Sequence, residues 1–549
     1  MTLFFKSVVF GAFVAAAANA ENLRSPVRFN DAKRQLSFDF IAGYRPDSSV
    51  TDHNAIDLDQ KQIADQVDNK SQEAFNLAKA VYEQGAHSKS YAKLTITSAV
   101  MPSLNDGDRY LGQTEAGIAV YGKVYKSDKS GDDEIYLQYE TSDSQSSYVN
   151  CQVGGLSAIG NQNTVGCFAT TGIISAPGSV TTYNYTYNVD EDNDNGRTIK
   201  GFSTSVESKM LTCSGSNQGC PYRDAEFFKD YYGNADYADK WVEAAISGGK
   251  TDFASGRGDA DFGVFDFTGR AECIKKGTAY LNVFMYVIRE FEDALDDCKS
   301  DCIKCNDKNV HAWDEGVAFY TGSLEGERGE TKGQLLHALA DKRCGDYKTC
   351  VGDTDFSTVN QELFQLFSVG QAELLSSRCP DARKTKEKIV DMMYVPLIQG
   401  TMRYAHKVDK QGLDGEKEKA EGAVFAAAVL PRIYAANKDA AQTIYDNMKV
   451  GASSTDHKAV KRAFESVYGD LNINCADVGG LIDTLTDDYF DGAGPCKASA
   501  SKAGGTFGIV AGVAGGAVAL GALGYIFFLR GREKQGKPVF APTSDERAV

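Results

Sequence analysis

The sequence predicts an α+β protein that is mainly helical, with a β-rich region in its N-terminal half and a single C-terminal transmembrane helix. Three observations support this fold class. Apolar residues recur at spacings of three and four over most of residues 225–482, which is typical of helices packed on a core. Alternating patterns rich in Gly, Ser, Thr and Tyr occupy 94–207. A charge-free stretch, 505–529, is long enough to cross a hydrocarbon core of about 30 Å.

The two ends of the chain carry targeting signals. Residues 1–20 combine a single lysine, Lys6, with an apolar run and a small-residue Ala-Asn-Ala end, which indicates a cleavable secretory signal. Basic residues follow the apolar stretch 505–529 at once, so the positive-inside rule places the tail, 530–549, in the cytoplasm. We therefore predict a type I single-pass protein of the plasma membrane, with its ectodomain outside the cell.

The composition indicates which kinds of partner and which cellular compartment suit this chain. The 75 acidic residues outnumber the 58 basic ones and give a net charge of −17, which disfavours nucleic acid as a partner. All 13 cysteines lie between Cys151 and Cys496, as expected for disulfides formed in an oxidising compartment, and the odd number leaves one thiol over. Asn69 and Asn184 each begin an Asn-x-Ser/Thr pattern, which predicts a glycoprotein.

The predicted elements fall into two ectodomain parts, an N-terminal domain over 21–220 and a helical domain over 221–500. A helical pattern covers 57–93, and the alternating pattern of 94–207 predicts strands. The helices predicted in the helical domain span 225–246, 270–297, 311–321, 332–342, 358–376, 384–408, 416–436 and 438–448.

The segment 311–320 carries the first candidate site. At about 100° per residue, His311, Asp314 and Glu315 fall on one side of a helix, whereas Tyr320 belongs to an apolar stripe on the other side and is assigned to the core. An imidazole with two carboxylates can hold a metal ion. The same spacing also fits a helix with an acidic, solvated face and a capping or core histidine, and it leaves both interpretations open.

Three longer segments resemble one protein family. They are His311–Ser323, Tyr231–Val242 and Glu421–Arg432, and they are similar to the iron-assimilation domain of algal periplasmic and cell-surface proteins. With its signal and anchor, the chain resembles the iron-starvation-induced phytotransferrins, and the resemblance covers roughly residues 225–497. It implies a non-enzymatic receptor that binds ferric iron, Fe(3+), together with carbonate at the cell surface. It also implies uptake by endocytosis, with endosomes as a second location and the endocytic machinery as a partner.

The resemblance draws attention to individual ligand candidates. Ferric iron is a hard cation that favours carboxylate and phenolate oxygens, with imidazole as an occasional donor. His311 and Glu315 meet this requirement, and Asp314 is either a third ligand or a residue that orients the imidazole. Other ligands must come from different helices, and the further metal-ligand candidates, all oxygen donors, are Glu421, Tyr232, Asp236 and Tyr394.

Carbonate would need a cation and amide donors. Arg403, or the helix start at Arg328–Thr331, is the candidate anion-binding site. Protonation of carbonate and of His311 in an acidifying endosome should weaken the attraction for iron. Iron retention is therefore expected to fall between about pH 7 and pH 5.

Two other classes of function remain open at the level of sequence. The Tyr-rich β region also suits a surface adhesion or carbohydrate-contact protein. The same histidine and carboxylates also suit a metal-dependent ectoenzyme, although no G-x-S-x-G elbow, Walker loop or His-Glu-x-x-His signature is present. Loss of His311 and Glu315 should abolish binding by an iron receptor and leave adhesion intact, whereas an enzyme needs an open coordination position and turnover.

Overall fold

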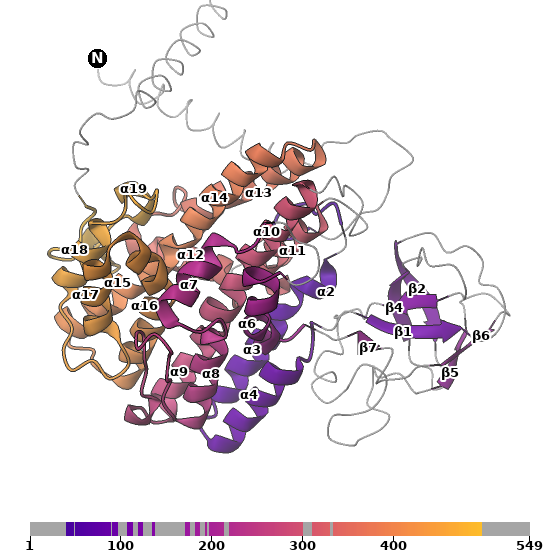
Figure 1. Cartoon of the computed structure of the whole chain (residues 1–549), viewed down its shortest axis with the longest axis horizontal. Coiled ribbons are helices and arrows are strands. Elements are labelled where there is room, and N and C mark those ends of the chain that lie inside the picture. Colours follow the sequence, from indigo (N-terminus) through magenta and orange to yellow (C-terminus); the bar gives the residue numbers. More distant parts are fainter. Residues whose placement is uncertain are drawn as a thin grey trace, which may run out of the picture. The chain divides into compact units, whose positions relative to one another are not determined.

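The structure is a computed structural model of the whole chain (Figure 1). It describes residues 40–48, 50–88, 197–213, 219–299, 310–329 and 333–496, together with short strands between 91 and 194. These residues all belong to one unit, Met1–Cys496. The predicted signal (1–20), anchor (505–529) and tail (530–549) lie outside the described residues. Within the described part, no helix is both long and apolar enough to cross a membrane.

Three helices open the described chain. They are α2 (Thr51–Asn54), α3 (Ile56–Val67) and α4 (Gln72–Gln84). The hydroxyl of Ser71 caps α4 by accepting a hydrogen bond from the Ala74 amide, and Gly85, with a φ of 65°, ends the helix. Apolar residues of α3 and α4 are buried in the main core, so this N-terminal segment is part of the helical body.

Seven short strands form one sheet, in which each strand pair is antiparallel. The strands are β1 (Tyr91–Ile96), β2 (Gly107–Gln113), β3 (Ala119–Val124), β4 (Glu134–Leu137), β5 (Thr171–Ser175), β6 (Thr182–Thr186) and β7 (Asn193–Asp194). Their order is β3-β2-β5-β6-β1-β4, and β7 pairs with β1. The end of the predicted β segment is instead helical, because Thr198 caps a helix, α6 (Ile199–Thr204), by accepting from the Gly201 amide.

The remaining helices build the helical body (Figure 1). They are α7 (Arg223–Tyr232), α8 (Tyr237–Ser247), α9 (Phe267–Gly277), α10 (Phe284–Lys299), α11 (His311–Thr321), α12 (Leu336–Tyr347), α13 (Thr358–Leu375), α14 (Cys379–Met393), α15 (Val395–Lys410), α16 (Glu416–Ala436), α17 (Lys438–Met448), α18 (His457–Glu465) and α19 (Cys475–Val478). A π-helical turn, η3 (Thr278–Val283), joins α9 to α10, and a short turn, η4 (Ser323–Glu325), follows α11. The mainly helical character predicted from the sequence is confirmed.

Some predicted boundaries hold and others do not. The predicted helices 311–321, 416–436 and 438–448 are present as α11, α16 and α17. The predicted helix 384–408 is wrong as a single element, because the chain breaks between α14 and α15 beside Pro396, which has no amide hydrogen to continue the helix. The predicted helix 225–246 is likewise two helices, because Gly233 ends α7 with a left-handed φ of 76°.

The apolar stripe of α11 fixes this helix in the core. Trp313 is fully buried, and Gly370 leaves the space for its ring, since a Cβ at that glycine would lie 2.0 Å from the indole. Tyr320 is 0% exposed, which confirms its predicted place in the core. Because one face of α11 is anchored in this way, the opposite face, with His311 and Glu315, meets the N-terminal segment.

Disulfides in the described chain link some residues that are close in sequence and others that are far apart. They join Cys213 to Cys220, Cys298 to Cys379, Cys344 to Cys350, and Cys475 to Cys496. The pair Cys298–Cys379 ties the end of α10 to the start of α14. Among the described residues, Cys273 is free, and it is buried in α9 as a small apolar side chain. The predicted use of cysteines in disulfides is therefore confirmed.

Candidate metal centre

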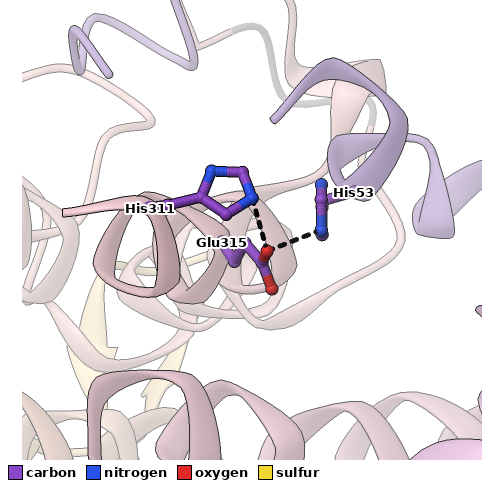
Figure 2. Close-up of side chains that lie close together, drawn as sticks. All are labelled: His53, His311 and Glu315. Atoms are coloured by element: carbon purple, nitrogen blue, oxygen red, sulfur yellow. Dashed lines mark ion pairs between the residues drawn. The ribbon is translucent and has the colours of Figure 1, made fainter. Parts of the chain in front are cut away.

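Three side chains from α2 and α11 converge on one point (Figure 2). Nε2 of His311 lies 2.9 Å from Oε1 of Glu315, and Nε2 of His53 lies 2.8 Å from the same oxygen. Ligand atoms of the three residues all lie within 4.8 Å of one another, and among the described residues they form the one such group. The side chain of His53 is 1% exposed, that of Glu315 14% and that of His311 24%, so the site is reached from solvent on the His311 side.

The hydrogen-bond pattern indicates the tautomer of His311. The hydroxyl of Ser48 donates to Oδ2 of Asp314 at 2.8 Å, so it accepts from Nδ1 of His311, 3.0 Å away. With the proton on Nδ1, a neutral imidazole directs the lone pair of Nε2 at the oxygen of Glu315. A proton or a metal ion must then lie between the two atoms. Metal-ligating histidines have this arrangement, in which a bond to the second nitrogen orients the ring.

Asp314 supports the site from behind the imidazole. It is 0% exposed and accepts from the Tyr44 hydroxyl at 2.5 Å, from the Ser48 hydroxyl and amide, and from Nε2 of Gln371 at 2.9 Å. Burial raises the pKa of Asp314 to about 6, against the lowering effect of these hydrogen bonds. Asp314 reaches His311 through Ser48, which is the orienting role that the sequence left open beside the ligand role.

The N-terminal segment, up to the start of α3, is bonded to the turn that follows α11. The amide of Ala42 donates to the Gly326 carbonyl at 2.9 Å, and farther along Asp57 accepts from the Ser323 hydroxyl at 2.8 Å and from the Leu324 amide at 2.7 Å. Burial raises the pKa of Asp57 to about 7. Between these bonds, α2 packs against α11, and the ring of His53 lies beside its partners.

The electrostatic field at the centre is set by the two imidazoles. Burial acts to raise the pKa of Glu315, but the charges and hydrogen bonds of His53 and His311 outweigh it and hold that pKa well below its ordinary value. Positive charge at this point therefore stabilises the buried carboxylate. A bound metal ion would supply this positive charge while both imidazoles stay neutral.

Acidic side chains of α10 surround the three residues. Burial, together with the charges of Glu315 and Asp293, raises the pKa of Glu290 to about 7, although the adjacent guanidinium of Arg289 lowers it. The pKa of Asp297 is raised to about 6 by burial and by its acidic neighbours, and the charge of His311 acts in the opposite direction. Carboxylates of α10 are thus close enough to interact with the metal centre through their charges.

The structure places the other metal-ligand candidates outside this group. The carboxylate of Glu421 accepts from the Tyr404 hydroxyl and lies 3.7 Å from Nζ of Lys276. The hydroxyl of Tyr232 donates to the Ala427 carbonyl at 2.8 Å. Each of these side chains is satisfied by a partner from the protein itself.

The remaining two oxygen donors are also engaged elsewhere. Tyr394 is 1% exposed at the junction of α14 and α15, with the guanidinium of Arg432 4.8 Å from its ring. Asp236 precedes α8 on the surface and lies 3.7 Å from Nζ of Lys240. The right side-chain types are therefore present, but the structure places them beside other residues, outside the centre.

The candidate anion-binding residues are also separate from the centre. Nε of Arg403, on α15, lies 3.0 Å from Oδ2 of Asp346. Arg328 is exposed in the turn after η4, and Thr331 lies outside the described residues. The cations whose charges act near the metal centre are instead Arg289 and Lys209.

His53 is the candidate ligand that sequence reasoning missed. It lies in the four-residue helix α2, and Asp57 follows it by four residues, the same spacing as between His311 and Glu315. In the sequence, the signals available for His53 are this spacing and the scarcity of histidine, of which the chain has 6. Its convergence with α11 is a tertiary contact that no local pattern encodes.

Comparison with known proteins points to one family. The sequence model of the family described as "Low iron-inducible periplasmic protein" matches residues 225–503 of the chain. That span contains His311 and Glu315, whereas His53 lies before it. The comparison with curated proteins and the comparison with solved structures each found no match.

Proposed function

Because the chain belongs to the family of low iron-inducible periplasmic proteins, we propose that it is a non-enzymatic cell-surface receptor for ferric iron. Family membership implies a role in iron assimilation during iron starvation. The observation that carries the finer proposal is the convergence of His53, His311 and Glu315 on one point. In this proposal the iron ion is the cargo of the receptor, and these three side chains hold it.

The three side-chain donors leave room for more oxygen ligands, and this is why carbonate is part of the proposal. Two imidazoles and one carboxylate form the facial triad that proteins use for ferrous iron, and this triad leaves coordination positions open. A ferric ion is harder and prefers more oxygen donors, so oxygens should fill those positions. Glu290 and Asp297 of α10 are candidates within the protein, and a bound carbonate would contribute further oxygens.

Two cations near the metal centre would balance a bound anion. Lys209 donates to the Tyr286 hydroxyl at 2.9 Å, and burial together with the charge of Arg289 lowers its pKa, while Glu315 acts to raise it. Arg289 lies 3.0 Å from Asp293 and also pairs with Glu290. These two cations replace Arg403 and Arg328 as the residues proposed to balance carbonate.

Uptake of the loaded receptor by endocytosis completes the proposal. It is supported by the sequence of the apolar stretch 505–529 and by the basic tail 530–549 that follows it. The receptor would then present its ectodomain outside the cell and its tail to the endocytic machinery. Internalisation of surface-labelled protein after iron addition, compared with a chain lacking 530–549, measures this step directly.

The central test is a ferric iron titration of the purified full-length protein in detergent. Iron is supplied as a weak chelate, with and without bicarbonate, and bound metal is counted after gel filtration. We expect saturable binding that is strengthened by bicarbonate. His53→Ala and His311→Ala should each lower the affinity by more than about 100-fold, since even outer-shell partners of a metal contribute about 10–100-fold.

His87→Ala is the matched control, because His87 is also half-buried but bonds to Gln62 outside the centre. It should bind iron as the unmodified chain does. Saturable binding that survives both His53→Ala and His311→Ala, or no saturable binding at all, would contradict the proposal. Adhesion that persists in the two variants without iron binding would favour the adhesion class, and turnover of a substrate would favour the ectoenzyme class.

A further inference from the structure

Five basic side chains gather where α9, α12 and α15 approach one another around α16. They are Lys276, Lys342, Arg343, Arg403 and Lys407. The chain as a whole carries a net charge of −17, so its composition does not account for a positive cluster. We call these five residues the basic cluster, and they include none of the metal-centre residues.

Arg343 is the most buried member of the basic cluster. It is 1% exposed, and its Nη1 lies 2.9 Å from Oδ2 of Asp346. Its Nε is buried and has no hydrogen-bond partner. A buried donor without a partner costs free energy, and such groups in native proteins usually face a water, an ion or a ligand.

Arg403 and Arg343 both pair with the carboxylate of Asp346. Its Nε lies 3.0 Å from the same Oδ2 of Asp346, so a single carboxylate oxygen serves two guanidinium groups. The side chain of Arg403 is 21% exposed, whereas that of Arg343 is 2% exposed. The pair therefore extends from the interior to solvent, with unused N–H donors on both groups.

Lys407 adds a third cation on the solvent side. It follows Arg403 by four residues on α15, and the two cations lie 5.3 Å and 5.4 Å from the centre of the Tyr404 ring. Like charges at this spacing repel one another. Burial lowers the pKa of Lys407, and the charges of Arg403 and Arg343 lower it further, which shows that the three cations act on one another.

The nearby acids do not neutralise this positive charge. Glu421 accepts from the Tyr404 hydroxyl and lies near Lys276, which also pairs with Glu272. The other four cations of the basic cluster share Asp346, Glu418, which lies 3.9 Å from Lys407, and Glu421, whose charge also acts on Lys342 and Lys407. Within this network, the buried Nε of Arg343 has no hydrogen-bond partner.

We propose that Arg343, Arg403 and Lys407 form a binding site for a small oxyanion of the phosphate or carboxylate type, separate from the metal centre. Guanidinium groups match such anions because their parallel N–H donors reach two oxygens at once. The anion would accept from the unpaired Nε of Arg343 and relieve the repulsion between the cations. Entry is from the side of Arg403 and Lys407, where both side chains are 21% exposed.

Calorimetric titration of the full-length protein with inorganic phosphate tests the site. Sodium acetate is the second probe, and sodium chloride at equal ionic strength is the baseline. We expect saturable binding of phosphate or acetate above that baseline, and the stronger of the two identifies the ligand type. Arg403→Gln and Lys407→Gln should each weaken binding by about 10-fold or more, since each removes a charged hydrogen-bond donor.

Lys410→Gln is the matched control on the same helix. Lys410 is 40% exposed, pairs with Asp409 and lies outside the basic cluster, so its substitution should leave phosphate binding unchanged. The anion should also raise the melting temperature of the unmodified chain, and this shift should shrink in Arg403→Gln even if that variant is less stable at the outset.

The proposal is overturned if neither phosphate nor acetate binds above the chloride baseline, or if Arg403→Gln binds them as tightly as the unmodified chain. His311→Ala tests the separation of the two sites. It should lose iron and keep the oxyanion, and loss of oxyanion binding in that variant would disprove the separation.

Discussion

Two of the helices that carry the family resemblance, α11 and α16, each place a carboxylate among a different kind of partner. On α11, Glu315 meets two imidazole nitrogens at 2.8 Å and 2.9 Å. On α16, Glu421 accepts from the Tyr404 hydroxyl and lies 3.7 Å from the ammonium of Lys276. The first carboxylate has partners that can share a metal ion with it, whereas the second is satisfied by donors from the protein. A buried carboxylate therefore indicates a metal site only where its partners can offer lone pairs.

A buried ion-pair cluster at the C-terminal end of α16 adds to this comparison. Breaking it should give the largest of the predicted effects. Arg432 is 5% exposed, and it pairs with Asp224 at 3.3 Å and with Asp391. Arg432→Met would leave both carboxylates buried without their cation, which typically costs about 3–5 kcal/mol. We expect a loss of this size in the free energy of unfolding, measured by denaturant titration.

The exposed pair Arg378–Asp381 provides the control for that experiment. Arg378 is 53% exposed, so Arg378→Met should change the free energy of unfolding by no more than about 1 kcal/mol. Equal effects of the two substitutions would mean that α16 is not held by its buried ion pairs. They would also weaken the distinction drawn between α16 and α11.

The second prediction compares the two carboxylates directly. Glu315→Gln should lower the affinity for ferric iron by more than about 100-fold, because it removes the carboxylate charge that both imidazoles face. Glu421→Gln should leave the affinity within about twofold, since its partners are Tyr404 and Lys276. Both affinities are measured by the iron titration described above. Loss of iron binding in Glu421→Gln alone would reverse the assignment of α11 and α16.

The third prediction concerns the support behind His311. Ser48→Ala removes the hydroxyl that accepts from Nδ1 of His311 and donates to Asp314. Outer partners of metal ligands are worth about 10–100-fold in affinity, so we expect a loss in that range, smaller than the loss in Glu315→Gln. Ser368→Ala, on the exposed face of α13, is the control and should bind iron normally. An unchanged affinity in Ser48→Ala would show that the ring needs no such orientation.

The contrast between the helices also shows what the sequence can predict. His311 and Glu315 were found from sequence because their spacing of four places both on one face of a helix, and that helix is present at the predicted residues. The apolar stripe likewise predicted the buried place of Tyr320. Which residues share a face of one helix follows from the helical period, so it can be derived without knowledge of the fold.

Relations between helices could not be derived in the same way. Glu421, Tyr232 and Tyr394 were predicted as ligands by chemical type, yet each lies among partners that only the packing of α15 and α16 supplies. The third candidate ligand of the centre, His53, comes from the N-terminal segment, which the sequence assigned to a different domain. Residue type sets which side chains can bind a metal, and the tertiary contacts decide which of them meet.

The last prediction concerns the attachment of that N-terminal segment to η4, the turn that follows α11. Asp57 accepts from Ser323 and Leu324, and burial raises its pKa from 3.8 to about 7. The folded chain therefore holds this proton more tightly than the unfolded chain does, so the stability contributed by the proton is complete below about pH 4 and is lost as the pH rises to about 7. In metal-free protein with a chelator present, the contribution should fall by no more than about 1.4 kcal/mol for each pH unit. Asp57→Asn cannot ionise and should remove this component of the pH dependence. A difference in unfolding free energy between the two chains that stays constant from pH 4 to pH 7 would show that the segment is held to η4 by contacts other than this carboxyl group.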